Sequence, residues 1–360
     1  MKADNKYVSY LDGLRGLAIL LVLLGHFGLT KMYLAFFGVT VFFFVSGFLI
    51  TKLLIYEFQK QGAIQLKEFY LRRIFRLYPA LIFMLLSVLI ILFIHRFQVL
   101  APDIMAGLFY FTNYYLVYLR PEHIPDNYLL VSRILWSLSV EEHFYLVFPL
   151  LFAICFRLGG KKFLTGIAIA LLVFLAIRIF SVQGLNPTRA MEVTYFPTHT
   201  RGDSILYGCL AALLIYSTKS SWYLRMLRSQ VVFWVAVALL GFSLVYRDAF
   251  FQNTLAYSLA GIGFFFAIPS FSFANETGFV RRLIDNKFTV YVGKLSYSLY
   301  LFHWIALKLG NLYFSEKNQQ WFLVVVPLTV GLSCLSYYVV ERPFLALRKK
   351  YGSNVKLGFR

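Results

Sequence analysis

The amino-acid sequence predicts an all-α polytopic membrane protein, a bundle of about ten transmembrane helices with both termini in the cytoplasm. The chain of 360 residues is 60% hydrophobic and 14% charged, and its mean hydropathy of +0.70 is too high for a water-soluble domain of this length. Apolar stretches long enough to cross about 30 Å of hydrocarbon recur along nearly the whole chain. These recurring apolar stretches exclude a soluble enzyme and a disordered protein.

The apolar stretches define the predicted spans and their orientation. Clusters of Lys and Arg follow the second, fourth, sixth, eighth and tenth stretch, and such clusters mark cytoplasmic loops. We therefore expect one transmembrane domain over residues 1–345 and a short basic cytoplasmic tail over 346–360. The expected spans are residues 11–30, 34–56, 79–97, 136–156, 163–181, 201–217, 231–246, 254–271, 290–309 and 320–341.

The charge balance and the cysteines limit the possible partners. Lys and Arg number 35 against 16 for Asp and Glu, a net charge of +19. Because the basic residues lie between apolar runs, the excess indicates topology and contact with a lipid bilayer or a polyanionic ligand, and it argues against nucleic acid. The three cysteines are widely spaced inside apolar runs, so they predict neither a disulfide framework nor a metal site.

Residues 98–135 form the longest predicted external segment. An extra full crossing there would break the parity of the topology, although residues 103–119 are apolar enough to suggest one. Asn113 and the neighbouring tyrosines favour an interfacial or re-entrant element instead. We expect specificity to lie in this segment and in residues 182–200, the other long outer loop.

The first span carries a polar face. Arg15 and His26 are eleven residues apart, which places them on the same face of a helix, about 16 Å apart along it. Asp12 lies one turn from Arg15 and is positioned to orient its guanidinium. Ionisable groups inside a span are costly and usually mark a substrate or proton path. A lone His, however, is often only hydrogen-bonded to a neighbouring helix.

Two further segments carry chemistry-bearing side chains. Arg72, Arg73 and Arg76 cluster on about one turn, where they could hold phosphates or serve only as a topology signal. Glu141 and Glu142 are adjacent in the fourth span and point about 100° apart, so they do not form one dyad. We expect a structural ion pair between Arg201 and Asp203 in the sixth span.

These segments resemble, in order, the acyltransferase 3 family of integral-membrane acyltransferases. The resemblance covers essentially the whole chain and includes a basic residue, ten intervening positions and a histidine, here Arg15 and His26. The matching segments are Leu11 to Gly16 with His26, Gly38 to Gly47, Arg72 to Arg76 with Pro79, Trp136 to Tyr145, Arg201 to Asp203, Ser296 to His303, and Glu341 to Pro343.

The resemblance implies a bacterial cytoplasmic-membrane enzyme that transfers an acyl group, typically acetyl, from acyl-CoA to a hydroxyl of a cell-surface saccharide. Acetyl-CoA is then a co-substrate, with no tightly bound cofactor and no metal. His26 would act as general base or accept the acyl group as an acyl-imidazole, with Arg15, Asp12, Glu141 and Glu142 in the catalytic set.

The resemblance also suggests residues for binding. The donor phosphates would be bound by Arg72, Arg73 and Arg76, and the substrate by Trp136, Ser139, Tyr145, Tyr300 and His303. Some family members carry a further hydrolase-like domain after the membrane part. Since this chain ends soon after its last span, we expect it to finish the transfer itself or to pass the acyl group to a separate glycan-assembly protein.

A proton-coupled transporter or a polysaccharide exporter is the alternative, because helices with intramembrane Arg, His, Asp and Glu also describe a carrier. The two halves show no corresponding Gly- or Pro-broken helices. The arginine cluster suits a phosphate-bearing donor better than a carried solute. The requirement for His26 in ester formation discriminates between these functions.

Overall fold

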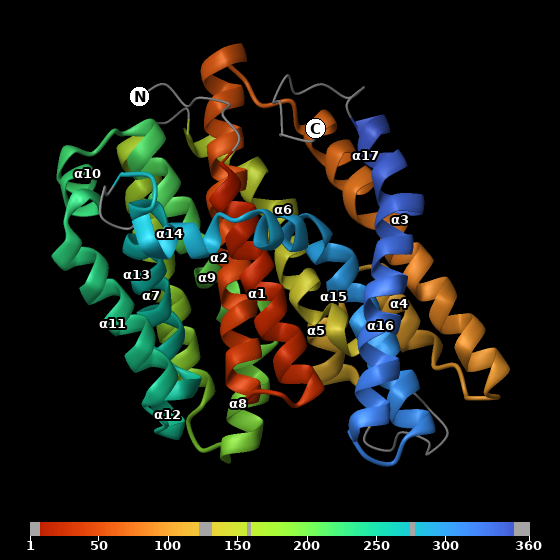
Figure 1. The fold of residues 1–360 in the computed structure, drawn as a ribbon. Helices are drawn as coiled ribbons and strands as arrows, with labels where there is room; N and C mark the ends of the chain where they lie inside the picture. The colour runs from red at the N-terminus through yellow and green to blue at the C-terminus, as the bar shows by residue number, and fades with distance from the viewer. Residues whose placement is uncertain (1–7, 122–131, 157–159, 274–277, 349–360) are drawn as a thin grey trace.

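The computed structural model of the protein describes residues 8–121, 132–156, 160–273 and 278–348, and every regular element in these ranges is a helix (Figure 1). Each of the ten predicted spans falls on a helix or on a helix and its continuation. The predicted tail after residue 348 lies outside the described residues. The long helices are α1 (Ser9–Phe27), α2 (Met32–Gln61), α3 (Leu66–Ile94), α6 (Trp136–Cys155), α7 (Gly160–Ser181), α9 (Thr198–Ala212), α11 (Gln230–Val245), α13 (Leu255–Ser270), α15 (Lys287–Tyr313) and α16 (Gln319–Leu335).

Short helices connect or extend these elements. Some continue a long helix, as η4 continues α9 and η6 continues α16, while others lie at the two ends of the bundle (Figure 1). They are α4 (Ala101–Leu108), α5 (Thr112–Tyr114), η1 (Tyr115–Leu119), η2 (Ser132–Leu135), α8 (Pro187–Tyr195), η4 (Leu213–Ser217), α10 (Ser221–Arg228), α12 (Ala249–Asn253), α14 (Gly278–Ile284), η6 (Ser336–Glu341) and α17 (Arg342–Arg348).

Six helical stretches among the described residues are long and apolar enough to cross a membrane, which makes this a multi-pass membrane protein. A seventh is obtained if α10 and α11, bent by 80° at their junction, are taken as one span. The helix α13 is apolar but shorter. The expected number of ten spans and the side of the termini therefore stay predictions. The six are Ser9–Phe27, Met32–Gln61, Leu66–Ile94, Ser132–Cys155, Lys161–Ser181 and Gln319–Leu347.

The helices α9 and α15 are not among these six, and most of their residues are buried in the protein. Most side chains of α15 from Leu295 to Leu307 are buried, and they include Ser296, Ser298 and His303. Polar side chains are tolerated at such positions when neighbouring helices supply hydrogen-bond partners. These two helices therefore form the interior of the bundle, where the chemistry-bearing side chains gather.

The central helices approach each other at glycines. A Cβ atom on Gly16 of α1 would collide with the backbone oxygen of Thr289 in α15, and one on Gly293 of α15 would collide with the oxygen of Asp12. A Cβ on Gly47 of α2 would likewise collide with the oxygen of Ile205 in α9. Small residues at helix contacts allow this backbone proximity. They place the polar side chains of α1 directly beside those of α15.

Residues 101–119 are divided among α4, α5 and η1, with a break at Tyr110, whose φ is +53°. The eight residues of α4 extend only about 12 Å, and so no helix here crosses about 30 Å of hydrocarbon. The expectation of an interfacial or re-entrant element agrees with these short helices. Residues 122–131 of the predicted external segment lie outside the described residues.

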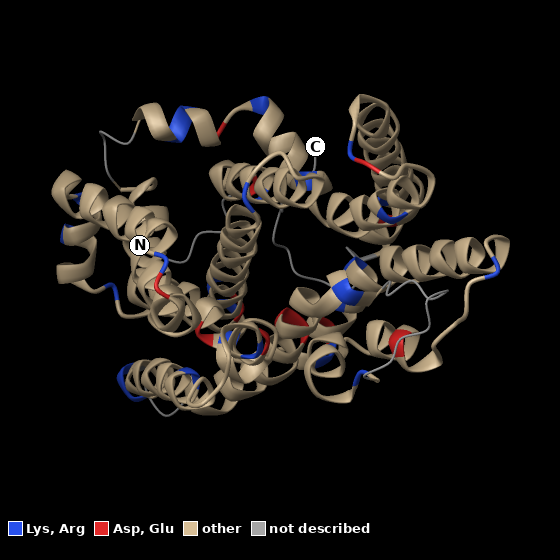
Figure 2. Cartoon of the chain, turned by 90° about the horizontal axis from the view of Figure 1, so that it is seen from below, with Lys and Arg blue, Asp and Glu red and all other residues tan. Residues whose placement is uncertain are grey.

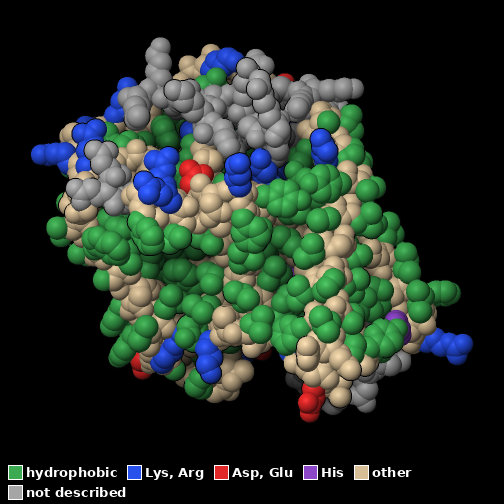
Figure 3. Space-filling view, viewed as in Figure 1, with side chains coloured by type: hydrophobic (Ala, Val, Ile, Leu, Met, Phe, Trp, Pro, Cys, Tyr) green, Lys and Arg blue, Asp and Glu red, His purple; other side chains and the backbone are tan. Residues whose placement is uncertain are grey.

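Charged and apolar side chains occupy different levels of the surface. Figure 3 shows a band of hydrophobic side chains across the middle of one face, with Lys and Arg above and below it. The start of α1 lies at the same end of the bundle as α17 (Figure 1). The view along the bundle in Figure 2 shows that acidic and basic stretches also lie among the helices. The candidate site lies among these helices.

Candidate functional site

The polar face predicted for α1 meets α15 at two points. Near the start of α1, the Arg15 Nη2 donates a hydrogen bond to the Ser296 Oγ at 3.0 Å. The Arg15 Nη1 lies 3.4 Å from the Asp12 Oδ1, one turn away as predicted. Near the far end of α1, the second contact joins His26 to His303. Most of the length of α1 separates these two contacts.

The two histidines form a hydrogen-bonded and stacked pair. The His26 Nδ1 lies 3.0 Å from the His303 Nε2, and the ring centroids are 5.1 Å apart with an interplanar angle of 17°. The His303 Nδ1 lies 3.0 Å from the backbone oxygen of Leu299, which accepts only, so this nitrogen carries the proton. In a neutral His303, the Nε2 is then an acceptor. His26 must donate from its Nδ1.

This assignment leaves the lone pair of His26 on its Nε2. No described residue makes a hydrogen bond to that nitrogen. The ring packs edge-on against Trp304 at 5.8 Å, and the Lys317 Nζ donates to the backbone oxygen of His26 at 2.8 Å. The imidazole is thus held on one side, while its basic nitrogen is available to a substrate. An imidazole in this state serves as a general base or as a nucleophile.

The two glutamates lie in a different part of the interior. The Glu141 Oε2 accepts hydrogen bonds from the Ser46 hydroxyl at 3.1 Å and from the Tyr145 hydroxyl at 3.0 Å. The charged groups that act electrostatically on Glu142 are Arg73, Glu141 and Arg76. Among the described residues, the His26 imidazole is therefore oriented by the hydrogen bond that it donates to His303, and not by a carboxylate.

The arginine cluster divides into two groups. Arg72 pairs with Glu57 of α2 at 3.2 Å and with Glu68 at 3.8 Å. The Arg73 guanidinium lies 4.0 Å from the centre of the Tyr145 ring. Arg76 lies near Arg15 and Arg73.

The positive charge near the start of the polar face of α1 thus comes from Arg15, Arg73 and Arg76. Arg72 instead ties the start of α3 to α2. A phosphate-binding role fits Arg73 and Arg76 better than Arg72, because a guanidinium already paired with two carboxylates has less capacity for a further anion.

The predicted substrate-binding side chains are largely engaged with the protein itself. The Ser139 Oγ donates to the Leu135 oxygen of its own helix at 3.0 Å. The Tyr300 hydroxyl lies 2.6 Å from the Ser137 Oγ and donates to the Ile134 oxygen at 2.8 Å. Trp136 packs against Tyr195, with ring centroids 4.5 Å apart. The Tyr300 side chain thus connects α15 to η2 and α6, and its ring centroid lies 5.8 Å from that of His303, whereas Trp136 packs against α8.

The two segments expected to determine acceptor specificity contact one another. Asn113 in α5 donates to the Thr198 hydroxyl at 2.8 Å, and the His143 Nδ1 lies 2.7 Å from the same oxygen. The Tyr114 hydroxyl lies 3.1 Å from the His199 Nδ1. Side chains from both predicted external segments thus meet beside His143 of the fourth predicted span.

The expected ion pair between Arg201 and Asp203 is wrong. Asp203 pairs with Arg178 of α7 at 2.7 Å, and both side chains are fully buried. Residues two apart on a helix point in different directions, so Arg201 and Asp203 cannot face each other. Arg178 was not among the predicted residues. Its position inside an apolar helix could have indicated a buried ion pair, because an arginine there requires a partner.

Arg201 lies instead in an aromatic enclosure. Its Nη2 donates to the Thr40 hydroxyl at 2.9 Å, and its guanidinium lies 4.1 Å from the centre of the Tyr257 ring. The rings of Phe43 and Tyr195 complete the enclosure. Its Nε and Nη1 are buried without a hydrogen-bond partner among the described residues.

Comparison with known proteins establishes the family. A family model described as an acyltransferase domain matches residues 8–340. The chain belongs to the acyltransferase 3 family. The matched region contains every residue of the polar line of α1, the histidine pair and the arginine cluster, so the family assignment and the described site concern the same part of the chain.

Curated relatives in this family cover the chain almost completely. Peptidoglycan O-acetyltransferase OatA of Listeria monocytogenes is 29% identical over 371 residues, which is 99% of this chain and 58% of the relative. O-acetyltransferase OatA of Staphylococcus aureus strain NCTC 8325 is 28% identical over 360 residues, 96% of this chain and 58% of the relative.

A third relative, from Staphylococcus aureus strain COL, bears the name O-acetyltransferase with the qualifier "putative". It is 30% identical over 94% of this chain and 57% of its own length. The chain thus spans somewhat more than half the length of these acyltransferase 3 relatives. No solved structure matches the chain.

Proposed function

We propose that the protein is an O-acyltransferase of a bacterial cytoplasmic membrane, which moves an acetyl group from acetyl-CoA to a hydroxyl of a cell-surface saccharide. The family and the names of its relatives support acetyl transfer to an oxygen. The observation that carries the proposal is the state of His26. Its Nδ1 donates to His303, and its Nε2 has no partner among the described residues.

In direct transfer, the His26 Nε2 takes the proton of the acceptor hydroxyl while the hydroxyl oxygen attacks the thioester carbonyl. A C–O bond forms, the C–S bond breaks, and the leaving CoA sulfur takes the proton from His26. His303 accepts the Nδ1–H throughout and so holds the imidazole in the reactive tautomer. In the acyl-enzyme route, the same Nε2 attacks the carbonyl, the C–S bond breaks and the CoA thiolate leaves. The acceptor hydroxyl then attacks the acyl-imidazole, the C–N bond breaks, and the hydroxyl proton passes to the thiolate. Both routes use one lone pair.

Charge along α1 supports a donor that arrives from the opposite end. Arg15, Arg73 and Arg76 concentrate positive charge about 16 Å along the helix from His26. Guanidinium groups bind phosphates bidentately. We propose that these three hold the CoA phosphates at the cytoplasmic side while the pantetheine arm extends along α1. The thioester then reaches His26 near the outer side, where the acceptor is presented directly or by a separate glycan-assembly protein.

Glu141 and Tyr145 serve a positioning role in this proposal. The Tyr145 hydroxyl donates to Glu141, and the Tyr145 ring lies under the Arg73 guanidinium. The carboxylate therefore fixes the ring on which Arg73 rests. Asp12 orients Arg15 in the same way from within α1.

The test compares membranes that carry the wild type, His26→Ala or His95→Ala, each incubated with acetyl-labelled acetyl-CoA. His95 is the matched control, because it lies beyond the end of α3 and contacts Tyr313. We expect CoA release and alkali-labile acetyl on endogenous glycans with the wild type and His95→Ala. His26→Ala should lose both while remaining in the membrane. Full activity of His26→Ala would remove His26 from the mechanism. Absence of label from all three, with acetylated solute crossing the membrane, would favour a carrier.

A further inference from the structure

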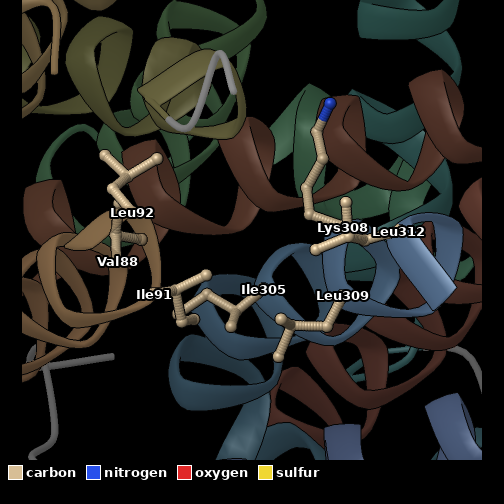
Figure 4. A pocket seen from close by; sticks show the side chains of 7 residues that line it. All are labelled: Val88, Ile91, Leu92, Ile305, Lys308, Leu309 and Leu312. Carbon is tan, nitrogen blue, oxygen red and sulfur yellow. The ribbon is translucent and has the colours of Figure 1, made fainter. Parts of the chain in front are cut away.

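A pocket lies between α3 and α15, along the part of α15 that follows His303 (Figure 4). Its walls are aliphatic side chains, and its one charged lining residue is Lys308. Figure 4 shows the α3 residues on one side and the α15 residues on the other, with the Lys308 amine extending beyond them. The lining residues are Val88, Ile91, Leu92, Ile305, Lys308, Leu309 and Leu312.

The pocket adjoins a lipid-facing surface. On α3, the side chains of Ile90, Phe93 and Ile94 alternate with the pocket residues and are among the most exposed apolar groups of the described chain, with Phe93 85% exposed. In a membrane, such side chains contact hydrocarbon. An apolar chain in the bilayer therefore has direct access to the pocket walls.

One aromatic ring separates the pocket from the reactive imidazole. The Lys308 Nζ lies 4.9 Å from the centre of the Trp304 ring, and Trp304 packs edge-on against His26 at 5.8 Å. The Trp304 Nε1–H is buried and has no hydrogen-bond partner among the described residues. A ligand group bound at Lys308 is thus separated from His26 by the Trp304 ring. It also lies next to the Trp304 Nε1–H, a donor without a partner among the described residues.

Cations predominate around this route. Arg133 acts electrostatically on both Lys308 and His26, and Lys317 contacts the His26 backbone. Neither Arg133 nor Lys308 forms an ion pair with a carboxylate in the described part of the chain. The carboxylate that acts electrostatically on Lys308 is that of Asp103, which accepts hydrogen bonds from the backbone and the hydroxyl of Ser132. The mouth of the pocket therefore suits an anion.

We propose that this pocket binds the lipid anchor of the acceptor, so that the acceptor class is a saccharide joined through phosphate to a long apolar chain. The chain lies between α3 and α15, and Lys308 with Arg133 binds the phosphate. The sugar then projects past Trp304 toward the His26 Nε2. This inference rests on the proposed function, since it names the acceptor of that reaction.

The activity test uses the full chain in vesicles with acetyl-labelled acetyl-CoA and three acceptors that share one disaccharide. The first carries the disaccharide on a long-chain alkyl diphosphate, the second on a long-chain alkyl glycoside, and the third on a methyl diphosphate. We expect kcat/KM for the first acceptor to exceed that for either of the others by about tenfold or more, since only it supplies both groups. Equal values for all three would overturn the inference.

The variant Lys308→Met keeps the length of the side chain and removes its charge. It should lower kcat/KM for the diphosphate-linked lipid about tenfold and leave the alkyl glycoside unchanged. The matched control is Lys294→Met, on the same helix about 21 Å away, which should change neither. An equal loss on all acceptors with Lys308→Met would assign Lys308 a structural role and overturn the inference.

A binding measurement separates this inference from the proposed function. A photoreactive long-chain alkyl diphosphate should label peptides of α3 or α15 in the wild type and in Lys294→Met, and less in Lys308→Met. Labelling that ignores Lys308 would indicate ordinary bilayer lipid in the pocket and overturn the inference. Lys308-dependent labelling without acetyl transfer to any acceptor would support the anchor site while the proposed function fails.

Discussion

Two sets of buried polar side chains in this bundle differ in how fully their hydrogen bonds are used. Around Arg178, the Nε donates to the Thr254 oxygen at 3.0 Å, the Nη1 to the Thr200 oxygen and to Asp203 at 2.7 Å, and the Nη2 to the Ser258 hydroxyl at 2.5 Å. At the histidine pair, His26 uses one ring nitrogen and keeps the other. A guanidinium whose three nitrogens all donate, here called the saturated cluster, holds helices together. An imidazole with one unpartnered nitrogen, here called the unsaturated pair with His303, can act on a substrate.

The largest expected effect concerns the saturated cluster and stability. Replacing Asp203 by Asn leaves the Arg178 charge uncompensated in the protein interior, and breaking a buried pair in this way costs about 3–5 kcal/mol. We expect a lower thermal midpoint and less protein in the membrane, measured by fluorescence-detected gel filtration after heating. Acetyl transfer per folded molecule should stay unchanged. A selective loss of transfer at normal stability would contradict the comparison.

The second prediction concerns the unsaturated pair. His303→Ala removes the acceptor that fixes the His26 tautomer, and transfer should fall on the order of 10²-fold at near-normal stability. The measurement is the initial rate of acetyl transfer from labelled acetyl-CoA. His303→Gln places an amide oxygen near the same position and should restore part of the rate. Identical rates for the two variants would show that His303 contributes only packing.

A smaller effect is expected within the arginine cluster. Arg73→Ala should raise the KM for acetyl-CoA about tenfold with little change in the KM for the acceptor, because it removes one phosphate-binding guanidinium. Arg72→Ala is the paired control. Since Arg72 is engaged with Glu57 and Glu68, its loss should reduce the amount of folded protein more than donor affinity. Equal effects of Arg73→Ala on both substrates would indicate a folding or topology role.

The smallest effect is expected at Ser139. Its hydroxyl donates to the Leu135 oxygen of its own helix, which already has a backbone partner available. Ser139→Ala should therefore change the free energy of unfolding and the free energy of activation by less than about 0.5 kcal/mol each. Both are accessible from the thermal and kinetic measurements above. A large rise in acceptor KM would return Ser139 to the substrate-binding set.

The sequence predicted the helices better than it predicted which of them face lipid. Every predicted span coincides with a helix, because long apolar runs favour helices in either environment. The same runs do not distinguish a lipid-facing helix from one buried among others. The segments 201–217 and 290–309 show this limit, since Asp203 in the first and Ser296 in the second form hydrogen bonds with side chains of neighbouring helices.

The site was predictable along one helix and not between helices. The shared face of Arg15 and His26 follows from the angle per residue. The hydrogen bond between His26 and His303 depends on how α1 and α15 are set against each other, 277 residues apart in the chain, and no local pattern encodes it. For the same reason, Asp203 was assigned to its neighbour Arg201 rather than to Arg178 on another helix.

The glycine contacts between α1 and α15 have a consequence for how the reaction cycle moves. At Gly16 and Gly293 the two backbones are so near that no side-chain layer separates them. The spacing of α1 and α15 near Arg15 is then set by main chain, which adjusts far less readily than rotamers. We expect an opening that admits or releases a substrate to involve movement of other helices, such as α3, rather than separation of α1 from α15. Substitutions on α3 can change acceptor specificity without disturbing the contact between His26 and His303.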